Sequence, residues 1–189
     1  DISTVTGTEY DCIGAKGTND VGWHFLPGTS ERYLHQIDAN STSAGYWNVD
    51  SEHPEAMYGR FARGFDIDNG KNALYFDVDD AFLRNTPLNG AYPVTIEVTY
   101  FDSGKGSWQL FYDTKGNANK RSTKIICTDT KTWKKATFVL NNARFANNAE
   151  KNSDFYIKNT GSTNVIFSVV ELSRPPQSSA AFITTPLTS

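Results

Sequence analysis

The stretch Asn72–Asp79 reads NALYFDVD and places Leu74, Phe76 and Val78 at every second position. A tyrosine and two aspartates occupy the positions in between and after them. Alternation with a period of two residues is typical of a β-strand that has one buried face. This segment therefore predicts a half-buried strand, and it shows the pattern that the rest of the chain repeats.

The same period recurs along the chain at short, regular spacings. It predicts further strands at Phe61–Ile67, Pro93–Phe101, Ser107–Asp113, Lys124–Cys127, Trp133–Leu140, Asp154–Lys158 and Val165–Leu172. Asn69-Gly70 precedes the Asn72–Asp79 strand, and Asn-Gly is a strong signal for a hairpin turn. Candidates for a helical turn are Ser51–Tyr58 and Asn142–Ala149. This arrangement predicts an all-β fold, an antiparallel two-sheet β-sandwich of the jelly-roll type.

The composition and the organisation of the 189-residue chain agree with such a fold. Aromatic residues make up 13% of the chain and hydrophobic residues 38%, with a single Met. The length suits one domain, and we expect the sandwich to span residues 1–174. The stretch Pro175–Ser189 (PPQSSAAFITTPLTS) lacks periodicity and is rich in Pro, Ser and Thr. Such a composition is typical of a linker or an extended tail.

Charge, hydropathy and cysteine content exclude several classes of protein. The formal net charge is −3, and no run of Lys and Arg exceeds a pair, so a nucleic-acid partner is not expected. No apolar run approaches the roughly 18 residues of a membrane span. The only cysteines are Cys12 and Cys127. They are compatible with one disulfide or with two buried thiols, and both alternatives stay open.

Residues 58–174 also contain a recognisable series of segments. These segments are GRFARGFD, LYFDVDDAF, VTIEVTYFDSGKGSWQLFYD, TKTWKKATFVLNNARFAN, NSDFYIKN and VVELSR. The series resembles the jelly-roll carbohydrate-binding modules that are attached to bacterial glycoside hydrolases and polysaccharide lyases. The most specific part lies between Trp133 and Phe155. Most of the matching residues suit core positions, so the resemblance supports the fold more than it identifies a ligand.

The resemblance implies a function. It implies a non-catalytic, monomeric module that binds plant or algal polysaccharide and holds a covalently linked catalytic domain close to it. It also implies secretion or attachment to the cell surface, with no required cofactor. Two alternatives stay open. One is a small polysaccharide lyase, and the other is a structural spacer between enzyme domains.

The segment between Gly14 and Arg60 is rich in loop-forming residues and holds isolated aromatic side chains. Aromatic rings stack on the C–H faces of sugars, while amide and guanidinium groups bind sugar hydroxyls. Most large aromatics of the strands share the parity of core residues, with Tyr75, Phe101 and Phe111 as exceptions. We therefore predict a loop-borne ligand site rather than one on a sheet face. Its candidate residues are Trp47, Trp23, Tyr46, Tyr33, Tyr58, Arg60 and Asn48.

Metal and catalytic signals are sparse. Asp77, Asp79 and Asp80 supply carboxylate oxygens, and they are candidates for a structural calcium site, although no complete ligand set can be assembled from the sequence. The motifs GxSxG and HExxH are absent from the sequence. His24, His35 and His53 lie near tyrosines, and a lyase needs a base of these types. They are the reason that the lyase stays as an alternative.

Overall fold

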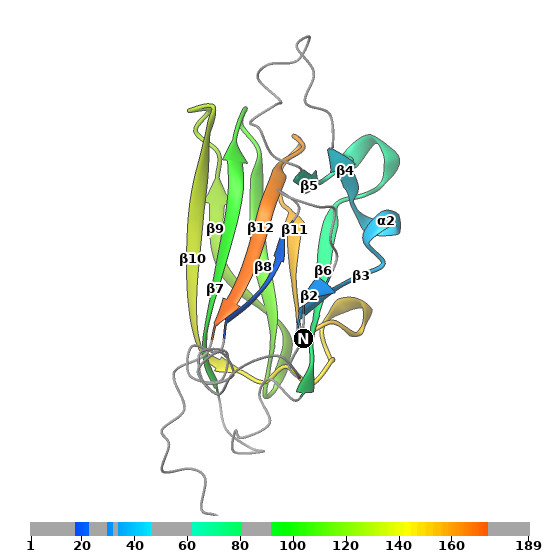
Figure 1. Cartoon of the computed structure of the whole chain (residues 1–189), viewed down its shortest axis with the longest axis vertical. Helices are drawn as coiled ribbons and strands as arrows, with labels where there is room; N and C mark the ends of the chain where they lie inside the picture. Colours follow the sequence, from blue (N-terminus) through cyan, green and yellow to red (C-terminus); the bar gives the residue numbers. More distant parts are fainter. Residues whose placement is uncertain (1–17, 23–29, 32–33, 47–61, 81–91, 174–189) are drawn as a thin grey trace, which may run out of the picture.

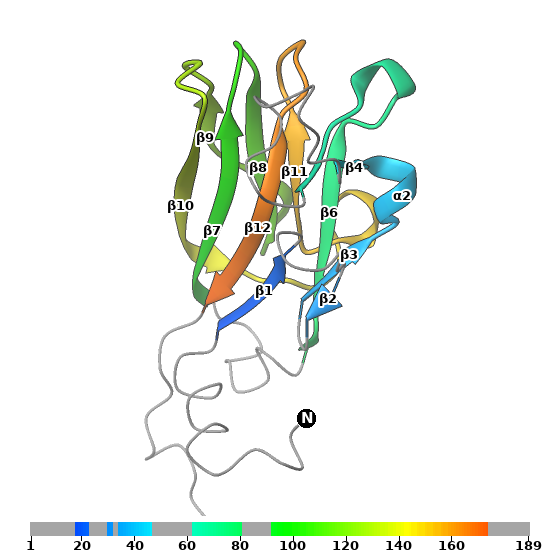
Figure 2. The ribbon, with the colours of Figure 1, turned by 45° about the horizontal axis from the view of Figure 1, so that its top comes forward.

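The computed structural model describes residues 18–22, 30–31, 34–46, 62–80 and 92–173, which form two facing layers of strands (Figures 1 and 2). Sheet I contains, in spatial order, β2 (Ser30–Glu31), β3 (Leu34–Ile37), β6 (Ala73–Val78), β11 (Phe155–Asn159), β8 (Ser107–Thr114) and β9 (Asn117–Ile126). Sheet II contains β10 (Thr132–Ala143), β7 (Tyr92–Asp102), β12 (Ile166–Ser173), β5 (Ala62–Gly64) and β4 (Ala44–Tyr46), with β1 (Thr18–Gly22) also paired to β12.

The chain passes back and forth between the two sheets. Strands β6, β8 and β11 of sheet I alternate along the sequence with β7, β10 and β12 of sheet II. Every strand pairing within the described ranges is antiparallel. The two sheets are joined through one pair of residues, Thr114 and Ala143. This architecture confirms the predicted antiparallel two-sheet β-sandwich of the jelly-roll type.

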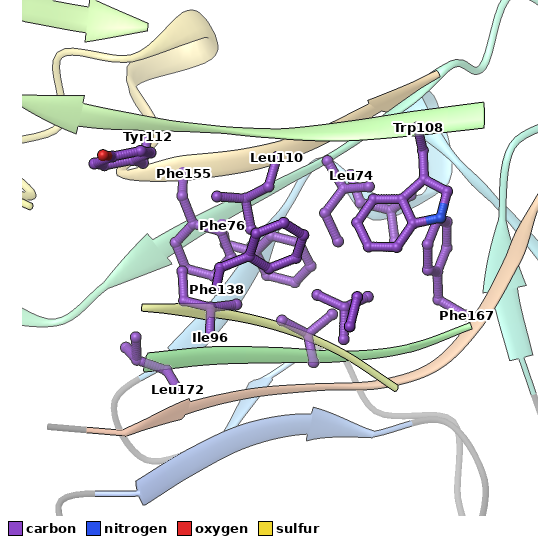
Figure 3. Packing of buried hydrophobic residues seen from close by; sticks show 14 of the residues in the cluster. Leu74, Phe76, Ile96, Trp108, Leu110, Tyr112, Phe138, Phe155, Phe167 and Leu172 are labelled. Atoms are coloured by element: carbon purple, nitrogen blue, oxygen red, sulfur yellow. The ribbon is translucent and has the colours of Figure 1, made fainter. Parts of the chain in front are cut away.

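The hydrophobic core fills the space between the sheets (Figure 3). Trp108, Leu110 and Tyr112 alternate along β8, and in Figure 3 Trp108 and Leu110 point from sheet I toward sheet II. The ring centres of Trp108 and Phe138 are 5.8 Å apart in an edge-to-face arrangement. Burial of each such side chain contributes roughly 2 kcal/mol or more. The core positions that strand parity predicted for these aromatic residues are therefore confirmed.

The strands predicted between Asn72 and Leu172 are present, but β9 is much longer than expected. Only Lys124–Cys127 was predicted there, whereas β9 begins at Asn117. Its first residues read NANKRST and have no apolar alternation. This pattern suits an edge strand that is largely exposed to solvent, and alternation of hydrophobic residues cannot reveal such a strand.

The hairpin predicted at Asn69-Gly70 is wrong. These residues follow the short 3₁₀ helix η3 (Ile67–Asn69), and Gly70 has a positive φ of 74° that suits glycine. The turn closes only an isolated bridge between Asp66 and Lys71. The strand before the turn, β5, belongs to sheet II, and the strand after it, β6, belongs to sheet I. The Asn-Gly signal identified a tight turn, but it did not reveal that the flanking strands belong to different layers.

The helical turn predicted at Asn142–Ala149 is also wrong. Strand β10 extends into this segment, and Phe145 and Asn147 have φ values of 50° and 57°, which an α-helix excludes. The backbone N–H groups of this loop bond to the buried carboxylates of Asp113 and Asp154. Those tertiary hydrogen bonds override the weak local preference for a helix.

Several expectations lie outside the described residues. These are the second helical candidate Ser51–Tyr58, the predicted tail Pro175–Ser189 and Cys12. Among the described residues, the structure shows a short α-helix, α2 (Ala39–Thr42), that the sequence did not predict. Cys127 is a buried, free thiol. No helix in the described part of the chain is long and apolar enough to cross a membrane.

Strand β3, helix α2, strand β4 and strand β5 together form one edge of the sandwich, which we call the closed edge. The buried guanidinium of Arg63 on β5 donates hydrogen bonds to the carbonyl oxygen of Ala39 at 2.8 Å and to Oδ1 of Asn40 at 2.8 Å. It also donates to Oγ of Ser43 at 3.0 Å, and that oxygen accepts a second bond from Gln36 on β3. These contacts hold the connection between sheet I and sheet II in place.

Candidate functional site

The predicted loop-borne site falls almost entirely outside the described residues. Trp47, Trp23, Tyr33, Tyr58, Arg60 and Asn48 all lie in segments that the structure does not describe. Of the candidate ligand residues, the structure therefore places only Tyr46. Whether these side chains meet in space stays a prediction.

Tyr46 is the last residue of β4, on the closed edge. Its ring is half-buried, and its hydroxyl donates a hydrogen bond to the carbonyl oxygen of Phe65. Burial, together with the nearby negative charge of Asp66, raises the pKa of this hydroxyl above its ordinary value. The hydroxyl of Tyr46 thus contributes to closing this edge of the sandwich.

The metal candidates Asp77, Asp79 and Asp80 lie at the end of β6. Asp77 is half-buried on the outer face of sheet I, while Asp79 and Asp80 are exposed. Within the ranges that the structure describes, no three His, Cys, Asp or Glu side chains gather closely enough to hold a metal ion. Calcium binding by these residues stays a prediction.

A buried carboxylate, Asp154, holds the loop between β10 and β11 against sheet I. It accepts hydrogen bonds from the backbone N–H groups of Val78 at 2.8 Å and Asn147 at 2.9 Å. Burial, assisted by the charges of Asp77 and Asp113, raises its pKa to about 7, against the opposite effect of the two backbone donors. This aspartate belongs to the segment that carries the sequence resemblance, and its contacts give it a structural role.

Three aromatic rings cross the outer face of sheet I, away from the core, and we call them the outer aromatic row. Tyr156 of β11 lies between Tyr75 of β6 and Phe111 of β8, which are its direct partners in the strand register. The Tyr156 and Phe111 rings stack in parallel with their centres 4.9 Å apart, and Tyr75 lies 5.3 Å from Tyr156. Because the rings stack on one another, their flat faces are occupied.

Polar contacts tie the two tyrosines of the row to neighbouring segments. The Tyr75 hydroxyl donates to Glu150 at 2.6 Å, and the Tyr156 hydroxyl donates to Asn119 at 3.1 Å. Burial, and then the neighbouring Glu150, raises the pKa values of both hydroxyls. Both side chains are only 3% exposed. The row is therefore a second, smaller core and not an open platform for a sugar ring.

The opposite edge of the sandwich, between β9 and β10, holds a cavity of about 620 Å³. In both ribbon views these two strands lie side by side along one edge (Figures 1 and 2). We call this the open edge, and the cavity its groove. Apolar side chains at the margin of the core line the groove, namely Tyr112, Ile125, Phe138 and Leu140. A volume of this size suits a ligand several rings long.

The remaining lining residues come from the two edge strands. Arg121, Ser122 and Thr123 belong to β9, and Thr137 and Val139 belong to β10. The side chain of Val139 is 65% exposed and lies at the rim of the groove, with the opposite strand parity to the buried Phe138 and Leu140. Hydroxyl and guanidinium groups beside apolar surface match the mixed character of a sugar, which has polar edges and apolar C–H faces.

Hydrogen bonds close the first end of the groove, where the chain passes from β9 to β10. The buried carboxylate of Asp102 accepts bonds from the hydroxyls of Thr128 at 2.9 Å and Thr130 at 2.6 Å, and it pairs with Lys134 at 2.6 Å. Burial alone would raise the pKa of Asp102, but Lys134, Thr130 and Thr128 together hold it far below its ordinary value. This end of the open edge is firmly held.

The second end of the groove lies where the two sheets join. Thr114 of β8 pairs there with Ala143 of β10. The Tyr112 hydroxyl points away from the core in Figure 3 and donates to Oδ1 of Asn142 at 2.9 Å. Between these two ends, β9 and β10 have no strand pairing with each other among the described residues. The groove is thus a gap between two edge strands that are fixed at both ends.

Sequence reasoning did not find this groove. Tyr112 and Phe138 were correctly predicted as core, but the polar start of β9 was not recognised as a strand, so no groove wall was expected. The available signal was the cation-rich stretch Asn117–Lys124 after the predicted strand Ser107–Asp113. A Gly at position 116, with φ of 91°, marks the turn between the two.

No protein-family model matches the chain, and no curated protein matches it. Solved structures do. The CBM22-1–GH10 modules of the Clostridium thermocellum xylanase 10B, complexed with xylohexaose, match with a TM-score of 0.44 and 11% identity. That match covers 87% of this chain and 29% of the other, so the chain spans less than a third of that structure.

Two further solved structures match over nearly their whole length. A xylan-binding module, CBM15, matches with a TM-score of 0.41 and 12% identity, covering 77% of this chain and 98% of the module. The C-terminal CBM6 of LamC, a marine laminarinase from Zobellia galactanivorans, matches with a TM-score of 0.39 and 11% identity, covering 82% and 100%. The chain is thus similar to carbohydrate-binding modules, as its sequence indicated, and the likeness concerns the fold alone.

Proposed function

We propose that this chain is a non-catalytic carbohydrate-binding module and that a polysaccharide lies along the groove of the open edge. The observation that carries this proposal is the groove itself, in which Tyr112 and Phe138 provide apolar surface while Thr123 and Thr137 provide hydroxyls. Sugars are bound by this combination, because their C–H faces pack on apolar groups and their hydroxyls exchange hydrogen bonds.

The length of the groove strands supports a polymeric ligand. Strand β9 has 10 residues and β10 has 12. The groove is lined by the part of β9 from Arg121 to Ile125, and at about 3.3 Å per residue these five residues extend over roughly 16 Å, which accommodates a short run of sugar units. A site that contacts several units gains affinity from each one, and a rigid sheet edge holds those contacts in register.

The wider role follows from the sequence resemblance and forms part of the proposal. The module would be monomeric and secreted or attached to the cell surface. By binding plant or algal polysaccharide, it would raise the local concentration of a linked catalytic domain at its substrate. The residues predicted from the sequence form a second proposed binding place: Trp47, Trp23, Tyr46, Tyr33, Tyr58, Arg60 and Asn48.

Binding is tested by affinity electrophoresis of the whole chain in gels that contain xylan, glucomannan, laminarin, polygalacturonate or alginate. We expect retardation on at least one of them. Thr123→Trp places a large ring at the exposed rim of the groove, and we expect it to abolish retardation. Ser162→Trp, at an exposed loop position elsewhere, is the matched control and should bind normally. Equal retardation of both variants would place the ligand outside the groove.

The same samples separate the proposal from its alternatives. A polysaccharide lyase would release unsaturated products, and a hydrolase would release new reducing ends. A structural spacer would show no retardation on any polysaccharide. We expect retardation without either kind of product.

A further inference from the structure

Strand β9 carries an unusual excess of positive charge. The stretch Asn117–Ile126 contains Lys120, Arg121 and Lys124 and no acidic residue, although the formal net charge of the whole chain is −3. Strand β9 is therefore locally positive in a chain whose net charge is negative. Such segregation of charge indicates attraction for an anion at this strand.

Four lysines in the described ranges form ion pairs, and the cations of β9, like Lys105 and Lys115, do not. Lys131, Lys134, Lys135 and Lys158 each pair with a carboxylate at 3.3 Å or less. No carboxylate in the described part of the chain forms an ion pair with any of the three cations of β9. Their charges are thus available to a ligand.

The neighbours of the β9 cations place two of them at the groove. The Lys120 ammonium lies 5.8 Å from the ring centre of Tyr112, a lining residue. Arg121 lines the groove directly, and its guanidinium carbon lies 6.0 Å from the ring centre of Phe111. A cation is attracted to the face of an aromatic ring beneath it, and this attraction limits the movement of the charged side chain.

The register between β9 and β8 fixes the face on which each cation lies. Lys120 pairs with the core-facing Tyr112 and is half-buried, whereas Arg121 pairs with Phe111 of the outer aromatic row and is exposed. Phe111 pairs with Arg121, but Gln109 pairs with Lys124, so the register shifts by a bulge between them. A bulge adds one residue and redirects the side chains that follow. As a result, Thr123 and Lys124 are both exposed, although neighbours on a regular strand point to opposite faces.

We infer that the polysaccharide bound at the open edge is anionic, and that Lys120, Arg121 and Lys124 contact carboxylate or sulfate groups along it. The inference rests on the proposed function and adds the chemical class of the ligand. The planar Arg121 guanidinium suits a bidentate contact with a carboxylate or sulfate group, and the two lysines act as point charges. The hydroxyl of Thr123 remains for uncharged parts of the sugar, while that of Thr137 donates to Glu97 at 3.2 Å.

An anionic ligand predicts strong sensitivity to salt. Charges exposed to solvent are screened over a distance of about 8 Å at physiological ionic strength. Because the three cations lie at the surface, raising the salt concentration should weaken binding of an anionic polysaccharide much more than binding of a neutral one.

The experiment compares two triple variants of the whole chain that have the same net charge. One is Lys120→Gln with Arg121→Gln and Lys124→Gln. The matched control is Lys105→Gln with Lys131→Gln and Arg144→Gln, at exposed positions outside the groove. Titration calorimetry measures binding to polygalacturonate, dextran sulfate and uncharged dextran at low and at physiological salt. Circular dichroism checks that each variant is folded.

We expect the wild type and the control to bind polygalacturonate or dextran sulfate, and the β9 variant to bind at least tenfold more weakly. Preference for polygalacturonate assigns carboxylates as the contacted groups, and preference for dextran sulfate assigns sulfates. Equal loss in both triple variants would overturn the inference, because it would show attraction by net charge alone.

Three other outcomes also overturn the inference. The first is that the wild type and the β9 variant are equally retarded in the xylan, glucomannan or laminarin gels and neither binds an anionic polymer. This outcome leaves the proposed function standing. Failure to bind any neutral or anionic polysaccharide removes the proposed function as well. Unchanged binding together with new self-association of the β9 variant in size-exclusion chromatography would show that the cations only protect an edge strand from pairing with another chain.

Discussion

The gap between the two sheets is filled at one edge of the sandwich and left open at the other. At the closed edge, Arg63 and Tyr46 fill the gap between the sheets with hydrogen bonds to the chain that crosses it. At the open edge, β9 and β10 are fixed at their ends by Asp102 and by the junction at Thr114, and the gap between them forms a groove. A filled gap contributes stability, whereas an unfilled one leaves room for a ligand.

The difference follows from the lengths of the strands at each edge. Strands β4 and β5 have three residues each, so side chains must supply the contacts that such short ladders lack. Strands β9 and β10 each pair along one side with a long partner, β8 and β7, and need no further support along their free sides. Long, well-paired strands therefore allow an edge of the sandwich to stay open.

The largest effect is expected at the closed edge, from Arg63→Met. The substitution keeps much of the side-chain volume but removes the buried guanidinium that donates to the oxygens of Ala39, Asn40 and Ser43. We expect a loss of about 3 kcal/mol in the free energy of unfolding, measured with urea. The exposed Arg144→Met is the control and should change stability by less than about 0.5 kcal/mol. Equal effects would mean that the closed edge is not held by Arg63.

A smaller loss is expected at the open edge from Asp102→Asn, which weakens the bonds to Thr128, Thr130 and Lys134. We expect a loss of about 2 kcal/mol at neutral pH. The folded state lowers the pKa of Asp102, so its carboxylate stabilises the protein above the ordinary pKa of 3.8, and this contribution is lost as the pH falls. The difference in the free energy of unfolding between wild type and variant should therefore become smaller in acid. A difference that is constant with pH would contradict this assignment.

Asp154 should show the opposite dependence on pH. Its pKa is raised to about 7 in the folded protein from 3.8, so folding favours the protonated form. Its contribution to stability is complete below about pH 4 and is lost as the pH rises through about 7. Relative to Asp154→Asn, the wild type should lose on the order of 3 kcal/mol between these values, measured by urea unfolding at several pH values. A wild type that gains stability relative to Asp154→Asn as the pH rises would refute the raised pKa.

The smallest expected effect is a change in affinity for the polysaccharide, and it tests whether the ligand binds at the predicted tryptophans or at the open edge. If the segment predicted from the sequence binds sugar through Trp47, then Trp47→Ala should weaken binding about tenfold, or about 1.4 kcal/mol, through the loss of ring stacking. Trp23→Ala should act in the same direction. Phe111→Ala, next to the open edge, is the comparison. Normal binding by both tryptophan variants, with a loss in the folded Phe111 variant, would move the site away from the loops.

The sequence was informative where burial imposed a pattern. Strands β6, β7 and β10 each have one face in the core, and their alternation predicted them. The same rule failed for the start of β9, because an edge strand with polar residues on both faces has no alternation to detect. It also gave no indication of α2, whose four residues are too few to show a helical period.

The candidate site was harder to predict than the fold. The sequence drew attention to aromatic residues, and its one described ligand candidate, Tyr46, uses its hydroxyl to close the other edge. The groove depends on which two strands end up as edges, and that is a property of strand order, not of local sequence. The hydroxyl and cationic residues of β9 can be recognised as candidate ligand contacts only once β9 is known to lie across from β10.

Cys127 follows β9 at the first end of the groove, close to Asp102. Burial, and then the charge of Asp102, raises the pKa of its thiol to about 11, so the thiol is protonated at neutral pH. Alkylating reagents attack the thiolate and need physical access to the sulfur. Cys127 can therefore be modified only when this corner of the sandwich opens. Its alkylation rate reports how often that opening occurs and whether a ligand in the groove slows it.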